Sequence, residues 1–118
     1  MCHVLIIEDN FLIAEYLGYL AKQAGATSIA SACTEAEAVR AAREQQPRII
    51  FSDVGLRAGT GPYAVRTIRA ELGEIPVIFI TGSPEFCEQC KPPVAILTKP
   101  VDGVGVTEAF RRLIPSSP

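Results

Sequence analysis

Polar residues suited to phosphoryl transfer stand at, or just past, the ends of apolar runs in the sequence. They are Glu8, Asp9, Asp53, Thr81 and Lys99. In an open parallel sheet, ligands bind at the carboxyl ends of the strands. Because each apolar run has the length of a strand, we expect these five side chains to share one pocket although they are far apart in the sequence.

Clustered carboxylates need positive charge nearby. Two like charges about 4 Å apart repel by roughly 4 kcal/mol at an effective dielectric constant of about 20. Lys99 supplies one countercharge, and a divalent cation would supply the rest. Mg²⁺ is usually held by a few carboxylates, a backbone carbonyl and waters, with positions left for phosphate oxygens. The residues therefore predict a Mg²⁺-dependent phosphoryl-transfer site.

The strands that position these residues follow from the hydrophobic pattern. Apolar runs alternate with amphipathic stretches, which predicts an α/β fold with a parallel sheet covered by helices on both faces. Right-handed crossovers favour a doubly wound sheet with strand order 2-1-3-4-5. In that order the ends of the first, third, fourth and fifth strands lie side by side. The predicted strands cover residues 3–7, 28–32, 48–52, 76–80 and 94–97.

The first two predicted helices are bounded by residues that favour caps. One runs from about residue 11 to residue 24, carries Leu12, Tyr16 and Leu20 on one face, and stops at Gly25, which suits a C-cap. The other begins after Thr34, which forms a capping box with the glutamate three residues later, and extends to about residue 44.

Glycines and a proline follow Asp53 and predict a loop there. This loop leads into a helix that ends at about residue 72, and a last helix covers about residues 104–113. Prolines leave room for little more than two helical turns between Thr81 and Lys99. The loop residues are Gly55, Gly59, Gly61 and Pro62.

Length and composition bound the class of protein. A chain of 118 residues has room for one domain, which we assign to residues 1–118. The net charge of −2 gives no basic excess, so we expect no nucleic-acid partner. The apolar stretch at residues 2–7 is too short for a signal peptide core or a membrane span. We therefore expect a cytoplasmic protein that does not bind a membrane.

The order and spacing of these residues resemble those of one family, over essentially the whole chain. The opening Val4-Leu5-Ile6-Ile7-Glu8-Asp9-Asn10, then Asp53, Thr81 and Lys99-Pro100, are similar to the motifs of CheY-like receiver domains of response regulators. The resemblance implies a flavodoxin-like (βα)5 fold and a protein of two-component signalling that catalyses only its own phosphorylation and dephosphorylation.

The resemblance also implies a role for each residue. Asp53 is the phosphoacceptor, and Mg²⁺ is held by Asp9 directly, by Glu8 mostly through a water, by Asp53, and by the backbone carbonyl of Gly55. Thr81 and Lys99 each contact a phosphoryl oxygen. Pro100 is expected to follow a cis peptide bond. In-line attack by a carboxylate on a phosphohistidine needs mainly positioning and charge neutralisation, which agrees with these roles.

Two features depart from the ordinary family pattern. Phe79-Ile80-Thr81-Gly82-Ser83 resembles, in part, the "FAT GUY" subgroup of single-domain regulators, but Pro84 stands where that motif has Tyr. Ile96 occupies the position at which ordinary receivers carry an aromatic residue that rotates inward on phosphorylation. The missing aromatic residue, together with the short segment between Thr81 and Lys99, indicates an atypical output face.

We expect a stand-alone signalling domain phosphorylated by a histidine kinase or a histidine phosphotransferase. Its downstream protein partner would bind the segment before the fifth strand, that strand and the last helix, and homodimer formation is left open. Three alternatives remain. The chain could be a pseudo-receiver that binds partners without phosphorylation, a receiver excised from a longer regulator, or a redox protein using Cys87 and Cys90. His3 is expected to be a core residue, as are Phe51, Phe79 and Phe110.

Overall fold

The computed structural model describes residues 2–56, 59–82 and 92–114. Its centre is a parallel sheet of five strands in the order β2-β1-β3-β4-β5. This confirms the predicted doubly wound, flavodoxin-like α/β fold. The strands are β1 (His3–Ile7), β2 (Ser28–Ala32), β3 (Ile49–Ser52), β4 (Val77–Thr81) and β5 (Val94–Thr98).

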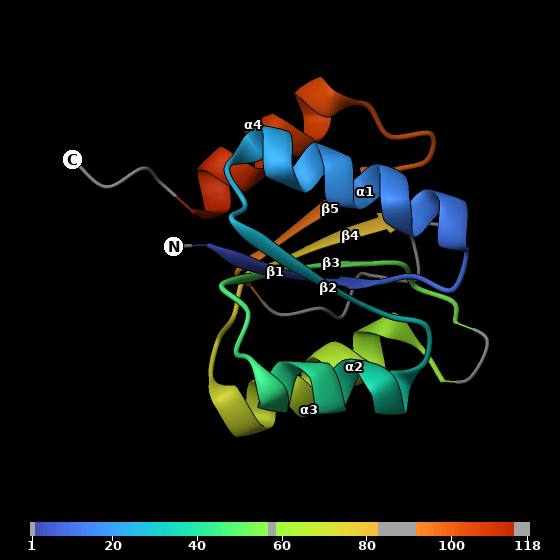
Figure 1. Ribbon diagram of the computed structural model, residues 1–118, viewed down its shortest axis with the longest axis vertical. Coiled ribbons are helices and arrows are strands. Elements are labelled where there is room, and N and C mark those ends of the chain that lie inside the picture. Colours follow the sequence, from blue (N-terminus) through green and yellow to red (C-terminus); the bar gives the residue numbers. More distant parts are fainter. Residues whose placement is uncertain (1, 57–58, 83–91, 115–118) are drawn as a thin grey trace.

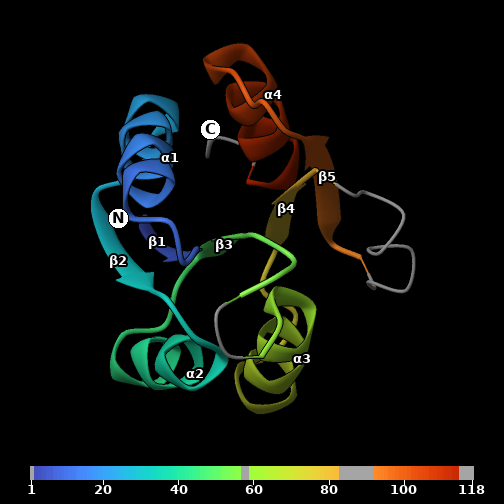
Figure 2. The ribbon, with the colours of Figure 1, turned by 90° about the vertical axis from the view of Figure 1, so that its right-hand side faces the viewer.

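Helices cover both faces of the sheet (Figures 1 and 2). The described part of the chain contains four: α1 (Phe11–Ala24), α2 (Glu35–Glu44), α3 (Gly61–Leu72) and α4 (Gly103–Leu113). Helices α1 and α4 lie on one face, and α2 and α3 on the other. The short helix expected between β4 and β5 falls on residues 83–91, which lie outside the described residues.

Two apolar cores result, one on each face of the sheet. Along β1, Val4 and Ile6 pack under α1 and α4, whereas Leu5 and Ile7 pack under α2 and α3, because successive side chains of a strand point to opposite faces. The predicted aromatic core residues are buried, at 0% exposure for Phe51 and Phe79 and 4% for Phe110. Phe51 and Phe110 meet edge to face, with ring centroids 6.3 Å apart.

Capping fixes where the helices begin and end. Asn10 caps α1 by accepting the N–H groups of Leu12 and Ile13, and Thr34 caps α2 as predicted. Gly25 ends α1 with a φ of 133°, a left-handed conformation that glycine adopts without strain. None of the helices in the described part of the chain has the length and apolar character needed to span a bilayer.

Two details of the predicted helices are wrong. The core face of α1 is formed by Ala14, Leu17, Leu20 and Ala21, while Leu12 is 73% and Tyr16 44% exposed. Leu20 is buried as the pattern suggested, but its neighbours on the core face are Ala14, Leu17 and Ala21, and not Leu12 and Tyr16.

The second correction concerns Gly61 and Pro62, which belong to the first turn of α3 and not to the preceding loop. Thr60 is the N-cap, and its side chain accepts the N–H of Tyr63. Proline is favoured in the first turn because the missing N–H would have no partner within the helix.

The strand register aligns the carboxyl ends of the strands. Ile7 pairs with Ser52, so Glu8 and Asp53 leave neighbouring strands side by side. Thr81 pairs with Thr98 at the end of β4 and β5, and the chain then reaches Lys99. The main-chain N–H of Asp53 donates to the carbonyl of Ile7 at 2.9 Å, and the main-chain N–H of Lys99 donates to the carbonyl of Thr81 at 2.9 Å. These bonds fix the backbone from which the site residues project.

Candidate functional site

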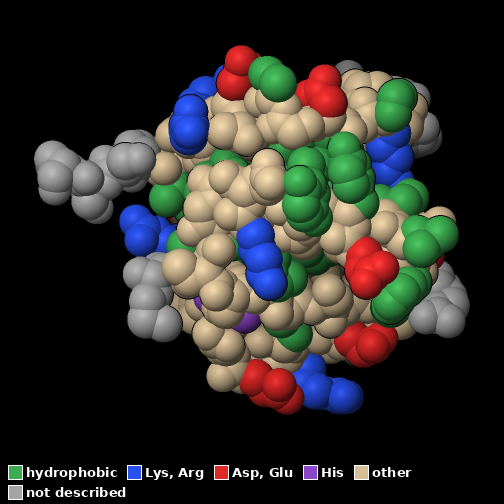
Figure 3. Space-filling view, turned by 45° about the horizontal axis from the view of Figure 1, so that its top comes forward, with side chains coloured by type: hydrophobic (Ala, Val, Ile, Leu, Met, Phe, Trp, Pro, Cys, Tyr) green, Lys and Arg blue, Asp and Glu red, His purple; other side chains and the backbone are tan. Residues whose placement is uncertain are grey.

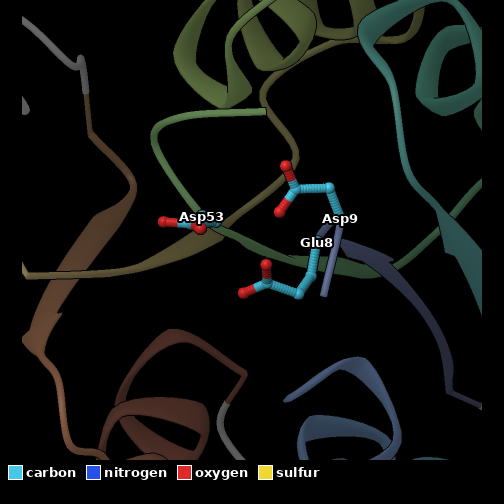
Figure 4. Close-up of side chains that lie close together, drawn as sticks. All are labelled: Glu8, Asp9 and Asp53. Atoms are coloured by element: carbon cyan, nitrogen blue, oxygen red, sulfur yellow. The ribbon is translucent and has the colours of Figure 1, made fainter. Parts of the chain in front are cut away.

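Three carboxylates meet at the carboxyl ends of β1 and β3. One oxygen from each of Glu8, Asp9 and Asp53 lies within 4.8 Å of the others. The three side chains approach a common space from two strands (Figure 4). Among the described residues this is the group found with the spacing of a metal site. Oxygen ligands at this separation suit a hard divalent cation such as Mg²⁺.

Glu8 and Asp9 differ sharply in burial although they are adjacent. Glu8 is 2% exposed, whereas Asp9 is exposed to solvent. The carboxylate of Glu8 accepts the main-chain N–H of Asn10 at 3.1 Å. Asn10 is the N-cap of α1, so the turn that caps this helix also orients Glu8. We did not assign a role to Asn10 from the sequence, although a cap residue directly before an apolar helix could have indicated it.

Lys99 reaches two of the carboxylates from the end of β5. Its ammonium lies 3.2 Å from Asp53 Oδ2 and 3.5 Å from Glu8 Oε1. Burial lowers the pKa of Lys99, but the charges of Glu8 and Asp53 outweigh this effect and raise the pKa above its usual value. Lys99 therefore stays protonated at neutral pH and neutralises part of the pocket.

One ammonium does not balance three carboxylates. Burial, and then the charge of Asp53, raise the pKa of Glu8, whereas the Asn10 N–H and Lys99 act in the opposite direction. The pocket thus retains negative charge that a divalent cation would neutralise. On this donor set and charge, the residues fit Mg²⁺.

The carboxylate of Asp53 is held so that its two oxygens differ. Oδ1 accepts the N–H of Val54 at 2.7 Å, and Oδ2 faces Lys99. The side chain of Asp53 retains 15% of its surface exposed. Asp53 is therefore oriented by the protein and is still accessible from outside.

The order of strands, the convergence of acids and the lysine contact point to one family. The sequence profile of the response regulator receiver domain matches residues 4–111. The chain belongs to the response regulator receiver domain family.

Known relatives of this receiver domain include regulators and a receiver from a kinase. The phyllosphere-induced regulator PhyR of Methylorubrum extorquens is 36% identical over 114 residues, which cover 94% of this chain and 43% of PhyR. The solution structure of the PhyR receiver domain of Erythrobacter litoralis is 32% identical, with a TM-score of 0.85 over 99% of this chain and 94% of that one. The chain spans less than half the length of the curated relative.

A magnesium-bound structure is also similar. The receiver domain of the sensor histidine kinase PA1611 from Pseudomonas aeruginosa, with a magnesium ion coordinated in its active-site cleft, is 26% identical. It aligns with a TM-score of 0.84 over 98% of both chains. Receiver domains bind Mg²⁺ in an acidic site, and this chain has a Glu/Asp/Asp cluster of that kind.

The other residues expected in the receiver site lie close by in the fold. Thr81 is 3% exposed at the end of β4. Gly55 is exposed in the loop after Asp53, where it forms an isolated bridge with Thr60. The roles of Thr81 and Gly55 towards a phosphoryl group and a metal stay predictions. The peptide bond between Lys99 and Pro100 is cis, as expected.

Three further expectations concern residues outside the acidic cluster. His3 is buried at the opposite end of β1, where its Nδ1 lies 2.7 Å from the hydroxyl of Ser28, so the prediction of a core residue is confirmed. Ile96 is 39% exposed on β5. The Cys87 and Cys90 pair lies outside the described residues.

Proposed function

We propose that this receiver domain accepts a phosphoryl group on Asp53 from a histidine kinase or a histidine phosphotransferase, in a reaction that depends on Mg²⁺. The observation that carries the proposal is the meeting of Glu8, Asp9 and Asp53 within 4.8 Å, with Lys99 3.2 Å from Asp53. A purely structural salt bridge would pair one acid with one base. Three carboxylates around one ammonium leave an excess of negative charge in the pocket, which a structural role does not require.

The protein's own groups are suited to such a transfer. An oxygen of Asp53 attacks the phosphorus of a phosphohistidine, the P–N bond breaks, and the nitrogen keeps the electron pair while the imidazole takes up a proton. Lys99 neutralises charge beside the attacking carboxylate, and Thr81 is proposed to donate its hydroxyl to a phosphoryl oxygen. Glu8, Asp9, Asp53 and the Gly55 carbonyl would hold Mg²⁺. When bound, the cation would neutralise charge on the phosphoryl oxygens.

Exposed apolar side chains near the acidic pocket support the proposal that the phosphoryl donor is a protein. Phe11 and Leu12, each 73% exposed, open α1 directly after the acidic turn, and Val104 on α4 is 67% exposed. The hydroxyl of Tyr16 donates to the Val101 carbonyl at 3.4 Å, which ties α1 to the connection after Lys99. This face carries hydrophobic side chains (Figure 3). A donor domain that brings its histidine to Asp53 would bury part of it.

Output is proposed to use β4, β5 and α4, so α4 would contribute to both the donor face and the output face. Thr81 and Lys99 stand at the ends of β4 and β5, so a phosphoryl group that contacts them would bias these strands and the following α4. Ile96 on β5 gives this face an aliphatic residue in place of an aromatic one. The downstream partner, or a second copy of the chain, would bind the altered conformation of these elements.

Intact mass spectrometry tests the proposal directly. Incubation with acetyl phosphate and Mg²⁺ is expected to add one phosphoryl group to the wild type, and neither the wild type with EDTA nor Asp53→Asn should gain it. Asp102→Asn is a matched control, because Asp102 is an exposed N-cap of α4 and asparagine caps helices equally well. Phosphorylation of Asp53→Asn to the wild-type level would refute Asp53 as the acceptor.

Each alternative makes its own prediction, and the mass measurement alone separates the pseudo-receiver from the proposed function. A pseudo-receiver would gain no phosphate and would still bind its partner. A receiver that is part of a longer regulator would gain phosphate, and because the chain covers 43% of PhyR, the activity of such a larger protein is not assigned to it. A redox protein would lose function on Cys87→Ser with the acidic pocket unchanged.

A further inference from the structure

The backbone carbonyl of Asp53 is enclosed by two residues that have no role in the site described so far. The hydroxyl of Ser52, a residue with 0% exposure, donates to this carbonyl at 2.7 Å. Gly61, in the first turn of α3, approaches from another direction. A Cβ on Gly61 would lie 1.8 Å from the carbonyl oxygen and 2.3 Å from the Ser52 hydroxyl. No side chain therefore fits at Gly61 while Asp53 keeps this position.

The close approach of Gly61 explains why Ser52 carries a hydroxyl. A carbonyl oxygen covered by another backbone cannot be freely solvated by water, and a buried acceptor without a donor costs free energy. Ser52 is the last residue of β3, and its side chain supplies that donor from inside the protein. Gly61 and Ser52 thus act together, one by contact and the other by a hydrogen bond.

The same peptide unit holds the carboxylate of Asp53. The carbonyl of Asp53 and the N–H of Val54 belong to one planar group, so fixing one end fixes the other. The Val54 N–H donates to Asp53 Oδ1 at 2.7 Å, which leaves Oδ2 facing Lys99. The carbonyl of Val54 accepts the N–H of Gly61 at 2.8 Å, so α3 is tied to the next peptide unit as well.

We propose that Ser52 is a positioning residue for Asp53, with Gly61 as the steric stop behind it. Together they fix the peptide plane whose N–H orients the Asp53 carboxylate, so that less conformational freedom is lost when the pocket binds a cation or accepts a phosphoryl group. The consequence for phosphorylation rests on the function proposed above, whereas the consequence for carboxylate orientation does not.

Ser52→Ala removes the hydroxyl without adding bulk. In the Mg²⁺-free protein, the amide proton of Val54 should move upfield in the NMR spectrum, because its bond to Oδ1 weakens. Mg²⁺ binding, measured by calorimetry, should weaken by a factor of up to about five, which is the full free energy of one hydrogen bond. Ser52→Cys keeps a weaker donor of similar size and should fall between Ser52→Ala and the wild type.

Ser28→Ala is the matched control. Ser28 also uses its hydroxyl in a part-buried hydrogen bond, to His3, but at the amino ends of the strands. It should lower stability to a similar degree and change neither the Val54 amide nor Mg²⁺ affinity. A general loss of stability therefore cannot imitate the effect of Ser52→Ala.

The outcomes separate this proposal from the proposed function. Unchanged Val54 amide and Mg²⁺ affinity in folded Ser52→Ala would overturn the positioning role, and so would equal changes in Ser28→Ala. If Ser52→Ala does not fold, Ser52→Cys decides. An upfield Val54 amide proton and weaker Mg²⁺ binding than in the wild type would support the positioning role, and no change in either would overturn it. If Asp53 in the wild type gains no phosphate from acetyl phosphate while the NMR and calorimetric differences are present, the positioning role stands and the proposed function fails.

Discussion

The two ends of the sheet bury titratable groups in opposite ways. At the amino ends, His3 is the single histidine of the chain, and burial lowers its pKa, so it stays neutral beside Ser28. At the carboxyl ends, burial raises the pKa of Glu8, which lies with Asp9, Asp53 and Lys99 in a pocket with excess negative charge. At one end the buried group is neutral, whereas the other end holds charge that folding alone does not favour.

The two ends should therefore respond to acid with opposite signs. The folded pKa of His3 lies below the usual 6.5, so the unfolded chain binds a proton first as the pH falls, and stability decreases. The folded pKa of Glu8 lies above the usual 4.5, so the folded protein binds a proton first, and stability increases as the pH falls towards 4.5.

The largest change is expected from removing the ammonium in the acidic pocket. Lys99→Met keeps the alkyl chain but leaves Glu8 and Asp53 without their countercharge. We expect the free energy of unfolding in urea without Mg²⁺ to fall by about 2 kcal/mol, below the range for a fully buried pair because the Lys99 side chain is 29% exposed. Lys22→Met, on the exposed side of α1, should lose less than about 0.5 kcal/mol. Equal stability of Lys99→Met and the wild type would remove the contrast between the two ends.

The next effect belongs to His3. Between pH 6.5 and its lower folded pKa, the wild type should lose up to about 1.4 kcal/mol of stability per pH unit as the pH falls. His3→Phe cannot bind a proton and should flatten this part of the profile. Urea denaturation of both proteins at several pH values measures the difference, and parallel profiles would show that His3 does not titrate in this range.

A smaller effect of opposite sign is expected from Glu8→Gln. Without Mg²⁺ at pH 7, this variant should be about 1 kcal/mol more stable than the wild type, because a neutral amide replaces a buried charge. The advantage should shrink as the pH falls towards 4.5 and should reverse when Mg²⁺ is added. Glu15→Gln on the exposed side of α1 is the control, and a destabilised Glu8→Gln at pH 7 would contradict the strain ascribed to the pocket.

Local rules predicted most of the fold. The bounds of α1 and β2 agree with the sequence because Asn10, Gly25 and the apolar runs act through short-range capping and burial. The meeting of Glu8, Asp53 and Lys99 was also predictable, since parallel strands end at the same edge of a sheet. Which face of α1 is exposed could not be predicted in this way. Leu12 lies at helical spacing from the buried Leu20, but α1 is turned so that Ala14 and Leu17 pack in the core and Leu12 is exposed.

Fine features of the site depend on contacts that no local pattern encodes. Adjacent acids at a strand end gave no indication that Glu8 is buried and Asp9 exposed, because this depends on how the chain turns into α1. Gly61 before a proline indicates a loop as readily as a helix start. Its contact with the Asp53 carbonyl arises only when α3 packs back against the end of β3.

The three carboxylates are proposed to form one cation site. The most direct test is the free energy of unfolding as a function of Mg²⁺ concentration. The wild type should gain stability steadily, by about 2.7 kcal/mol at a concentration 100 times the dissociation constant, and Asp53→Asn should gain clearly less. A wild type whose stability does not change with Mg²⁺, or an equal gain in Asp53→Asn, would show that the three carboxylates do not form such a site.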